Sequence, residues 1–202
     1  MTGRITYYYA IASGFAYLGE PELRRIAWKA GVEIDYRPVD IRKVFRDSAT
    51  IPPPEQSEIR LNYRRLELAR WGLRRNMPIN PQPAFWPVDV KPASLTVLAA
   101  QALGYDAGAL SFALLRAVWA EERNISEADT IREITENILS KIEAMSVIRR
   151  AYDHSTSEIY DKLTAVATAS GVFGSPTYIV RDELFFGQDR LDFVAEALGV
   201  SE

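Results

Sequence analysis

A serine stands where a strand-like segment meets a helix-like segment, in the stretch IASGFAYL (residues 11–18). The first turn of a helix has unpartnered backbone N–H groups and a partial positive charge, so it stabilises an anion placed there. The hydroxyl of Ser13 can donate a hydrogen bond to such an anion. It can also act as a helix N-cap by accepting from backbone N–H groups. The two roles are compatible, and both remain open.

Basic and aromatic side chains gather further along the chain. A run of six arginines, typical of a solvated helix face, comprises Arg60, Arg64, Arg65, Arg70, Arg74 and Arg75. Phe85 and Trp86 follow in a proline-rich segment, where they could line an aromatic pocket or pack into the core. Trp71 and Trp119 are expected in the core.

The rarer residue types exclude several kinds of chemistry. The chain has no cysteine, which rules out disulfides, thiolate metal sites and CxxC redox chemistry within the protein. His154 is the only histidine, so no site uses two imidazoles, and we expect it on a helix surface. Carboxylates such as Glu121 and Glu122 show no metal-ligand spacing, so we expect no metal site.

The overall composition predicts a folded domain without a polyanionic partner. The 202 residues are 48% hydrophobic and 25% charged, with a net charge of -3, which is enough apolar material for a sizeable core. This charge balance favours neither nucleic acid nor an anionic membrane surface. No export signal is visible and no apolar run reaches about 18 residues, so we expect a cytoplasmic protein.

Hydrophobic patterning predicts sheet elements at the two ends and helices between them. Strands are predicted over 4–10 and 32–39, separated by a helix over 15–30, and a proline-rich loop follows at 48–56. Residues 56–170 are mostly helical. They include a helix with Ile59, Tyr63, Leu66 and Ala69 on one face, and a long helix over roughly 148–170. Two short strands, 176–180 and 183–187, and a final helix over 189–199 complete the chain.

The order β-α-β, helical block, β-β-α is that of thioredoxin. It predicts an α/β, thioredoxin-like fold with a large all-helical insertion. Residues 1–40 and 148–202 would form the thioredoxin-like domain, and residues 41–147 the helical insertion domain. A helical block of this size can pack a core of its own.

Several motifs together resemble one family. The stretch GVFGSPTYIV (171–180) resembles the loop of thioredoxin-like proteins that carries a cis-proline, which would be Pro176. Ser13 takes the place of the first cysteine of their CxxC motif. With RLNY (60–63), VWAEERNIS (118–126) and FFGQDRL (185–191), the chain resembles the 2-hydroxychromene-2-carboxylate isomerases, relatives of kappa-class glutathione transferases within the DsbA-like group. It departs from their pattern D-F-x-S-P-x-x-Y-L at Ala10 and Gly14.

The resemblance implies that glutathione is the cofactor and that its thiolate sits beside Ser13. It implies a further glutathione-binding set of Thr50, Ser175, Pro176, Gln188 and Asp189. Ser175 and Pro176 would pair with the cysteinyl backbone, and Gln188 and Asp189 would contact the γ-glutamyl group, unless the latter two simply start the last helix. Four residues are predicted to bind the substrate: Arg60, Tyr63, Phe85 and Trp86.

The activity implied is that of a glutathione-dependent isomerase in bacterial naphthalene degradation. It would interconvert 2-hydroxychromene-2-carboxylate and trans-o-hydroxybenzylidenepyruvate. Reversible addition of the thiolate to the enone would turn its double bond into a rotatable single bond. The partner would thus be a small aromatic carboxylate, and the resemblance also implies a homodimer.

Two other interpretations of the function remain open. One is a kappa-like glutathione transferase or peroxidase that uses the same site without isomerising its substrate. The other is a thioredoxin-fold binding module without catalysis, which the departures at Ala10 and Gly14 favour. A disulfide oxidoreductase is excluded by the absence of cysteine.

Overall fold

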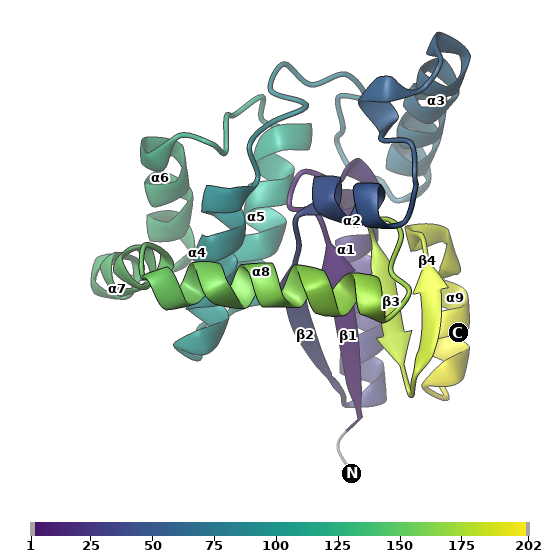
Figure 1. Cartoon of the computed structure of the whole chain (residues 1–202). Coiled ribbons are helices and arrows are strands. Elements are labelled where there is room, and N and C mark those ends of the chain that lie inside the picture. The colour runs from purple at the N-terminus through teal and green to yellow at the C-terminus, as the bar shows by residue number, and fades with distance from the viewer. Residues whose placement is uncertain (1–2, 201–202) are drawn as a thin grey trace.

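A computed structural model describes residues 3–200 as a four-stranded sheet with helices around it (Figure 1). The helices and strands are β1 (Arg4–Tyr9), α1 (Gly14–Ala30), β2 (Glu33–Pro38), α2 (Ile41–Asp47), α3 (Glu58–Arg74), α4 (Lys91–Ala102), α5 (Ala107–Trp119), α6 (Ala128–Ile138), α7 (Lys141–Ala151), α8 (His154–Ala169), β3 (Thr177–Val180), β4 (Glu183–Phe186) and α9 (Leu191–Ala197). Short 3-10 turns lie at Pro53–Glu55 and Gln188–Arg190.

The sheet has the order β2-β1-β3-β4. β1 pairs with β2 in parallel, while β1 with β3 and β3 with β4 are antiparallel. The parallel pair needs a crossover, and α1 provides it. This is the predicted α/β, thioredoxin-like arrangement with a helical segment between β2 and β3, so the predicted fold class is confirmed.

Alternation along β1 places helices on both faces of the sheet. Tyr7 and Tyr9 point to one face, where their rings stack with centroids 4.3 Å apart in the core shared with α1 and α9. Tyr8 points to the opposite face and packs with Val44 of α2 and Ala167 of α8. Figure 1 shows α8 lying across this second face. A strand covered on both faces is apolar or aromatic at nearly every position, as RITYYYA is.

A tight hairpin joins β3 to β4. Arg181 and Asp182 have φ of 50° and 70°, the left-handed conformation of both central residues in a type I′ turn. The two-residue gap between the predicted strands has the length of such a turn, although neither residue is glycine.

Two helical predictions need correction. The helix predicted over 148–170 is two helices, because α7 ends at Ala151 and α8 begins after the N-cap position Asp153. On α3, the predicted apolar face at Ile59, Tyr63 and Leu66 is exposed. The fully buried positions of α3 are Leu68 and Gly72, which lie on a different side of the helix.

The helical block and the sheet share one continuous core. Buried residues of α4 and α5 belong to the same apolar cluster as β1 and α1, and Trp119 at the end of α5 is fully buried, as predicted. The domain boundaries at residues 40/41 and 147/148 stay a prediction. No helix within residues 3–200 is long and apolar enough to cross a bilayer.

Candidate functional site

Ser13 is the N-cap residue of the 17-residue helix α1. Its backbone is extended (φ -85°, ψ 120°), and its Oγ accepts from the backbone N–H of Ala16 at 3.3 Å. The same hydroxyl donates a long hydrogen bond of 3.4 Å to the backbone carbonyl of Ser175. The first turn of α1 contains no acidic side chain, so no carboxylate offsets the positive end of the helix dipole.

Ser175 ties the loop before β3 to the loop before α1. Its Oγ accepts from the backbone N–H of Ala10 at 2.9 Å. The Ser175–Pro176 peptide bond is cis, in agreement with the resemblance to thioredoxin-like proteins. Two segments more than 160 residues apart in sequence thus form a single small surface around Ser13.

The turn that carries Ser13 is packed from behind by two side chains. Nε1 of Trp119 donates to the carbonyl of Ala12 at 3.2 Å. A Cβ at Gly14 would lie 2.8 Å from Cδ2 of Leu68 and 3.1 Å from the Trp119 ring, which is too close for an ordinary contact. The departure from the family pattern at Gly14 therefore has a structural reason, since α3 and α5 approach α1 where another residue would place its side chain.

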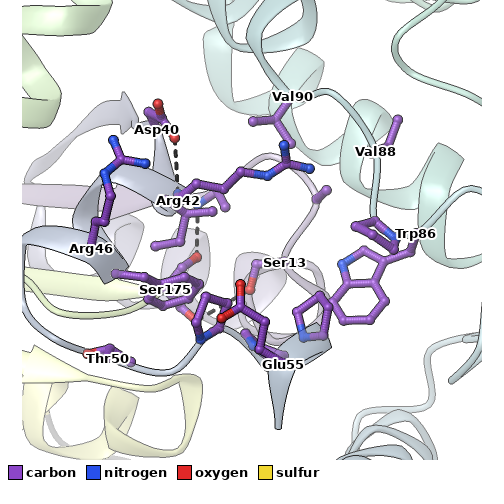
Figure 2. Close-up of a pocket in the computed structure, with 18 of the residues that line it drawn as sticks. Ser13, Asp40, Arg42, Arg46, Thr50, Glu55, Trp86, Val88, Val90 and Ser175 are labelled. Carbon is purple, nitrogen blue, oxygen red and sulfur yellow. Dashed lines mark hydrogen bonds between the residues drawn. The ribbon is translucent and has the colours of Figure 1, made fainter.

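A cavity of about 830 Å³ opens in front of Ser13 (Figure 2). Its size lies within the ~300–1,000 Å³ typical of ligand pockets. Of the predicted site residues, the structure brings Ser13, Thr50, Trp86 and Ser175 together around this cavity. The other walls come from α2, from the proline-rich segments 51–54 and 86–91, and from α8.

The remaining predicted residues lie outside the lining of this cavity. Arg60 and Tyr63 are on the exposed side of α3, and Phe85 is partly exposed one residue before Trp86. Pro176 is buried immediately after Ser175.

Gln188 and Asp189 lie close to Pro176 in the chain's fold, because the N–H of Gly187 donates to the Pro176 carbonyl at 2.9 Å. The Gln188 side chain is buried, and its Oε1 accepts from Nε and Nη2 of Arg75 at 3.0 and 2.9 Å. The carboxylate of Asp189 forms an ion pair with Arg190 at 3.1 Å.

Sequence reasoning missed four cations in the cavity wall. Arg64 of α3 lies with its guanidinium carbon 4.9 Å from the ring centroid of Phe15 and 5.4 Å from that of Trp86. The other three are Arg42 and Arg46 on α2, and Lys91 at the start of α4. Figure 2 shows the Arg42 side chain extending over the pocket, whereas that of Arg46 points away from it.

The pattern that could have identified Arg64 is its place one helical turn after Arg60, but spacing alone does not say which turn of a helix faces a cavity. Desolvation lowers the pKa of Arg64 to about 10, so the guanidinium remains charged at neutral pH.

Four carboxylates also line the cavity, namely Asp40, Glu55, Asp89 and Asp161. Oδ1 of Asp40 caps α2 by accepting from the backbone N–H groups of Arg42 and Lys43. Asp161 lies 3.9 Å from the ammonium of Lys91. Within residues 3–200, no carboxylate forms an ion pair with Arg42, Arg46 or Arg64. These three arginines of the cavity wall are therefore available to an anionic ligand. No group of three or more histidine, aspartate or glutamate side chains in this part of the chain is placed to hold a metal ion.

Comparison with known proteins agrees with this geometry. The 2-hydroxychromene-2-carboxylate isomerase of Sphingobium xenophagum is 28% identical over 200 residues, which cover 98% of this chain and 99% of the isomerase. The isomerase of the same name from Pseudomonas putida is 25% identical over 203 residues, covering 96% and 94%. The chain is thus a distant homologue of these isomerases over its full length.

Solved structures show the same fold. A 2-hydroxychromene-2-carboxylate isomerase superimposes with a TM-score of 0.83 at 23% identity, over 97% of this chain and 94% of that one. The cytosolic disulfide reductase DsbM from Pseudomonas aeruginosa, solved with GSH, has a TM-score of 0.66 at 18% identity, over 98% and 100%. A family model described as a DSBA-like thioredoxin domain matches residues 4–199. The chain therefore belongs to the DsbA-like thioredoxin-domain family.

Proposed function

We propose that the protein is a glutathione-dependent isomerase of a conjugated aromatic keto acid, with 2-hydroxychromene-2-carboxylate and trans-o-hydroxybenzylidenepyruvate as its model pair. The observation that carries the proposal is the position of Ser13. Its hydroxyl lies at the N-terminus of a long helix, with no acidic residue in the first turn, and faces a cavity that also contains unpaired cations. Full-length homology to 2-hydroxychromene-2-carboxylate isomerases supports the choice of reaction.

The residues around the cavity fit glutathione. The chain has no thiol of its own, so sulfur chemistry at this site requires a thiol from a ligand. Bound glutathione would supply a thiolate that can add reversibly to an activated double bond. Thr50, Ser175 and Pro176 are the proposed contacts near the cavity. Gln188 and Asp189 would be reached by the part of the tripeptide that extends past Pro176.

The role proposed for Ser13 is to hold a negative charge at the start of α1. The hydrogen bond from its Oγ to the Ser175 carbonyl is long, at 3.4 Å, so the hydroxyl can be redirected to an anionic ligand at little cost. The unpartnered N–H groups at the start of α1 add to this stabilisation. Cationic side chains in the cavity wall would stabilise the negative charge that develops on the substrate oxygen during isomerisation.

The test distinguishes the role of the Ser13 hydroxyl in catalysis from its role as the N-cap of α1. Ser13→Ala and Ser13→Gly both remove the hydroxyl, but glycine is a much better N-cap than alanine. We expect calorimetry to show glutathione binding by the wild type, and absorbance to show interconversion of the model pair that stops without glutathione. Both variants should lose the isomerisation, although Ser13→Gly keeps nearly wild-type stability. Full activity in Ser13→Gly would show that Ser13 only caps the helix, and no glutathione binding by the wild type would refute the proposal.

A product assay distinguishes the isomerase from a kappa-like transferase. A chloronitrobenzene incubated with glutathione and the protein would give a stable conjugate if the site transfers glutathione. The proposal expects turnover of the keto-acid pair to exceed conjugate formation. The reverse order would favour the transferase.

The proposal includes a homodimer, which the family resemblance implies. A stripe of exposed apolar side chains along α3, which a second copy of this chain could cover, supports it. The stripe consists of Ile59, Tyr63, Leu66 and Leu73.

A further inference from the structure

We infer that Arg64, held between the rings of Phe15 and Trp86 in the cavity wall, determines specificity by binding the carboxylate of a planar aromatic acid. The inference deepens the proposed function, on which it rests for the identity of the reaction. It assigns the acid-binding role to a residue one helical turn beyond Arg60, the residue that family resemblance suggested.

Arg64 combines free donors with a largely buried side chain, unlike the other arginines of α3. Arg60 and Arg74 are exposed. Arg65 donates to Glu58 at 2.9 Å and to Asn62 at 2.7 Å, and Arg70 donates to Glu67 at 2.7 Å. Arg75 is bound to Gln188. By contrast, none of the other residues between 3 and 200 accepts a hydrogen bond or forms an ion pair with Arg64. A guanidinium has five N–H donors in a fork that matches a carboxylate.

The environment of Arg64 is costly for an unpaired charge. The side chain is largely removed from water, and desolvation is what lowers its pKa. Two aromatic rings within 5.4 Å of the guanidinium carbon offset part of that cost by cation–π attraction, but they consume none of its N–H donors. A desolvated cation with free donors on the wall of a cavity is an arrangement that an anionic ligand would complete.

The surroundings of Arg64 also specify the shape of the acid. Trp86 packs against Trp119 with ring centroids 5.9 Å apart, so the indole is supported from behind. Pro87 follows in the same wall, and Phe15 belongs to the first turn of α1, two residues after Ser13. A flat, conjugated acid can place its carboxylate on Arg64 and its ring against these apolar surfaces. Its remaining atoms then lie in the same cavity that Ser13 faces.

The first test measures acid recognition without catalysis. The probes are trans-2-hydroxycinnamate and its methyl ester, titrated by calorimetry into the protein without glutathione. We expect the wild type to bind the acid about tenfold or more tightly than the ester, as befits a charge-assisted contact. Arg64→Met should abolish that preference, and Arg64→Lys should restore only part of it, because an ammonium cannot make the bidentate contact. Arg70→Gln is the matched control on the same helix and should behave as the wild type.

Stability provides a second readout that a structural role would not produce. Because Arg64→Met removes an unpaired, desolvated charge and retains a long apolar side chain, its melting temperature without ligand should equal or exceed that of the wild type. A marked fall in melting temperature with an unchanged acid-to-ester ratio would overturn the inference. So would loss of the ratio in Arg60→Gln but not in Arg64→Met.

Kinetics separate this inference from the proposed function. If the model keto acids are isomerised, Arg64→Met should raise KM far more than it lowers kcat. An unchanged KM would refute the role of Arg64 while leaving the isomerase proposal intact. Conversely, an Arg64-dependent preference for the acid in a protein that does not isomerise the pair would support the acid site and refute the isomerase.

Discussion

Ser175 and Ala10 are joined by a hydrogen bond of 2.9 Å, from the backbone N–H of Ala10 to the side chain of Ser175, across 165 positions of sequence. The carbonyl of the same serine accepts from the hydroxyl of Ser13. Ser175, a single residue in the loop before β3, therefore holds both the backbone that leads into α1 and the hydroxyl of Ser13. The geometry of the site depends on this tertiary contact as well as on the local sequence around Ser13.

Replacing Ser175 by alanine should destabilise the fold and loosen the site. The change leaves the buried N–H of Ala10 without its acceptor, which costs about 1–3 kcal/mol. Urea denaturation of Ser175→Ala should show this loss, together with weaker glutathione binding. Ser170→Ala, at an exposed position after α8, is the control and should change little. Equal stability of the two variants would mean that Ala10 finds another acceptor.

Gly14 should not tolerate a side chain. A methyl group there would meet Leu68 and the indole of Trp119, and overpacking of this kind costs about 1–3 kcal/mol. We expect Gly14→Ala to lower the free energy of unfolding in urea. In the background of Leu68→Val, which shortens the closest neighbour, the same change should cost less. A double-mutant cycle measures this coupling, and strict additivity of the two changes would contradict the predicted clash.

Glu20 should make stability fall as pH rises. Its carboxyl is fully buried and accepts from the Tyr36 hydroxyl at 2.7 Å, and burial raises its pKa from 4.5 to about 7. Because the folded state binds the proton more tightly than the unfolded state, the stabilisation is complete below pH 4.5. It is lost as pH rises from there through about 7. The loss is on the order of 3 kcal/mol, at ~1.4 kcal/mol for each pKa unit.

Denaturation in urea between pH 5 and 8 measures that loss. Glu20→Gln should flatten the decline, because the amide does not ionise. Glu22→Gln is the control, since Arg25 and the other nearby cations lower the pKa of Glu22 and its contribution has the opposite sign. A decline that persists unchanged in Glu20→Gln would assign the effect to another group.

The exposed stripe on α3 should control the oligomeric state. Ile59→Glu places a charge at the N-terminal end of a surface that, in the proposed dimer, is buried against a second copy. Sedimentation equilibrium should then show a dimer for the wild type and a monomer for Ile59→Glu. Ile142→Glu, which makes the same kind of change at an exposed position of α7, should remain dimeric. A monomeric wild type would contradict the dimer outright.

Much of the fold was readable from local sequence. Strand and helix patterns at the two ends depend on side-chain alternation and capping, which act over a few residues. For this reason the sheet elements, the hairpin at Arg181 and Asp182, and the helix start at Ser13 were all predictable. The break between α7 and α8 also has a local signal, the polar run DHSTS beginning at Asp153, although the helical pattern continues on both sides of it.

What the sequence determined by itself is a thioredoxin-like order of elements, the absence of any thiol, and a serine at the start of the first helix. Only the tertiary structure decided which side of α3 is buried, and so which of six arginines reaches the cavity. Periodicity shows that a helix has faces, but burial depends on the partner it meets. Arg64 lies against Phe15 and Trp86 because three segments distant in sequence converge there, and no local pattern encodes that convergence.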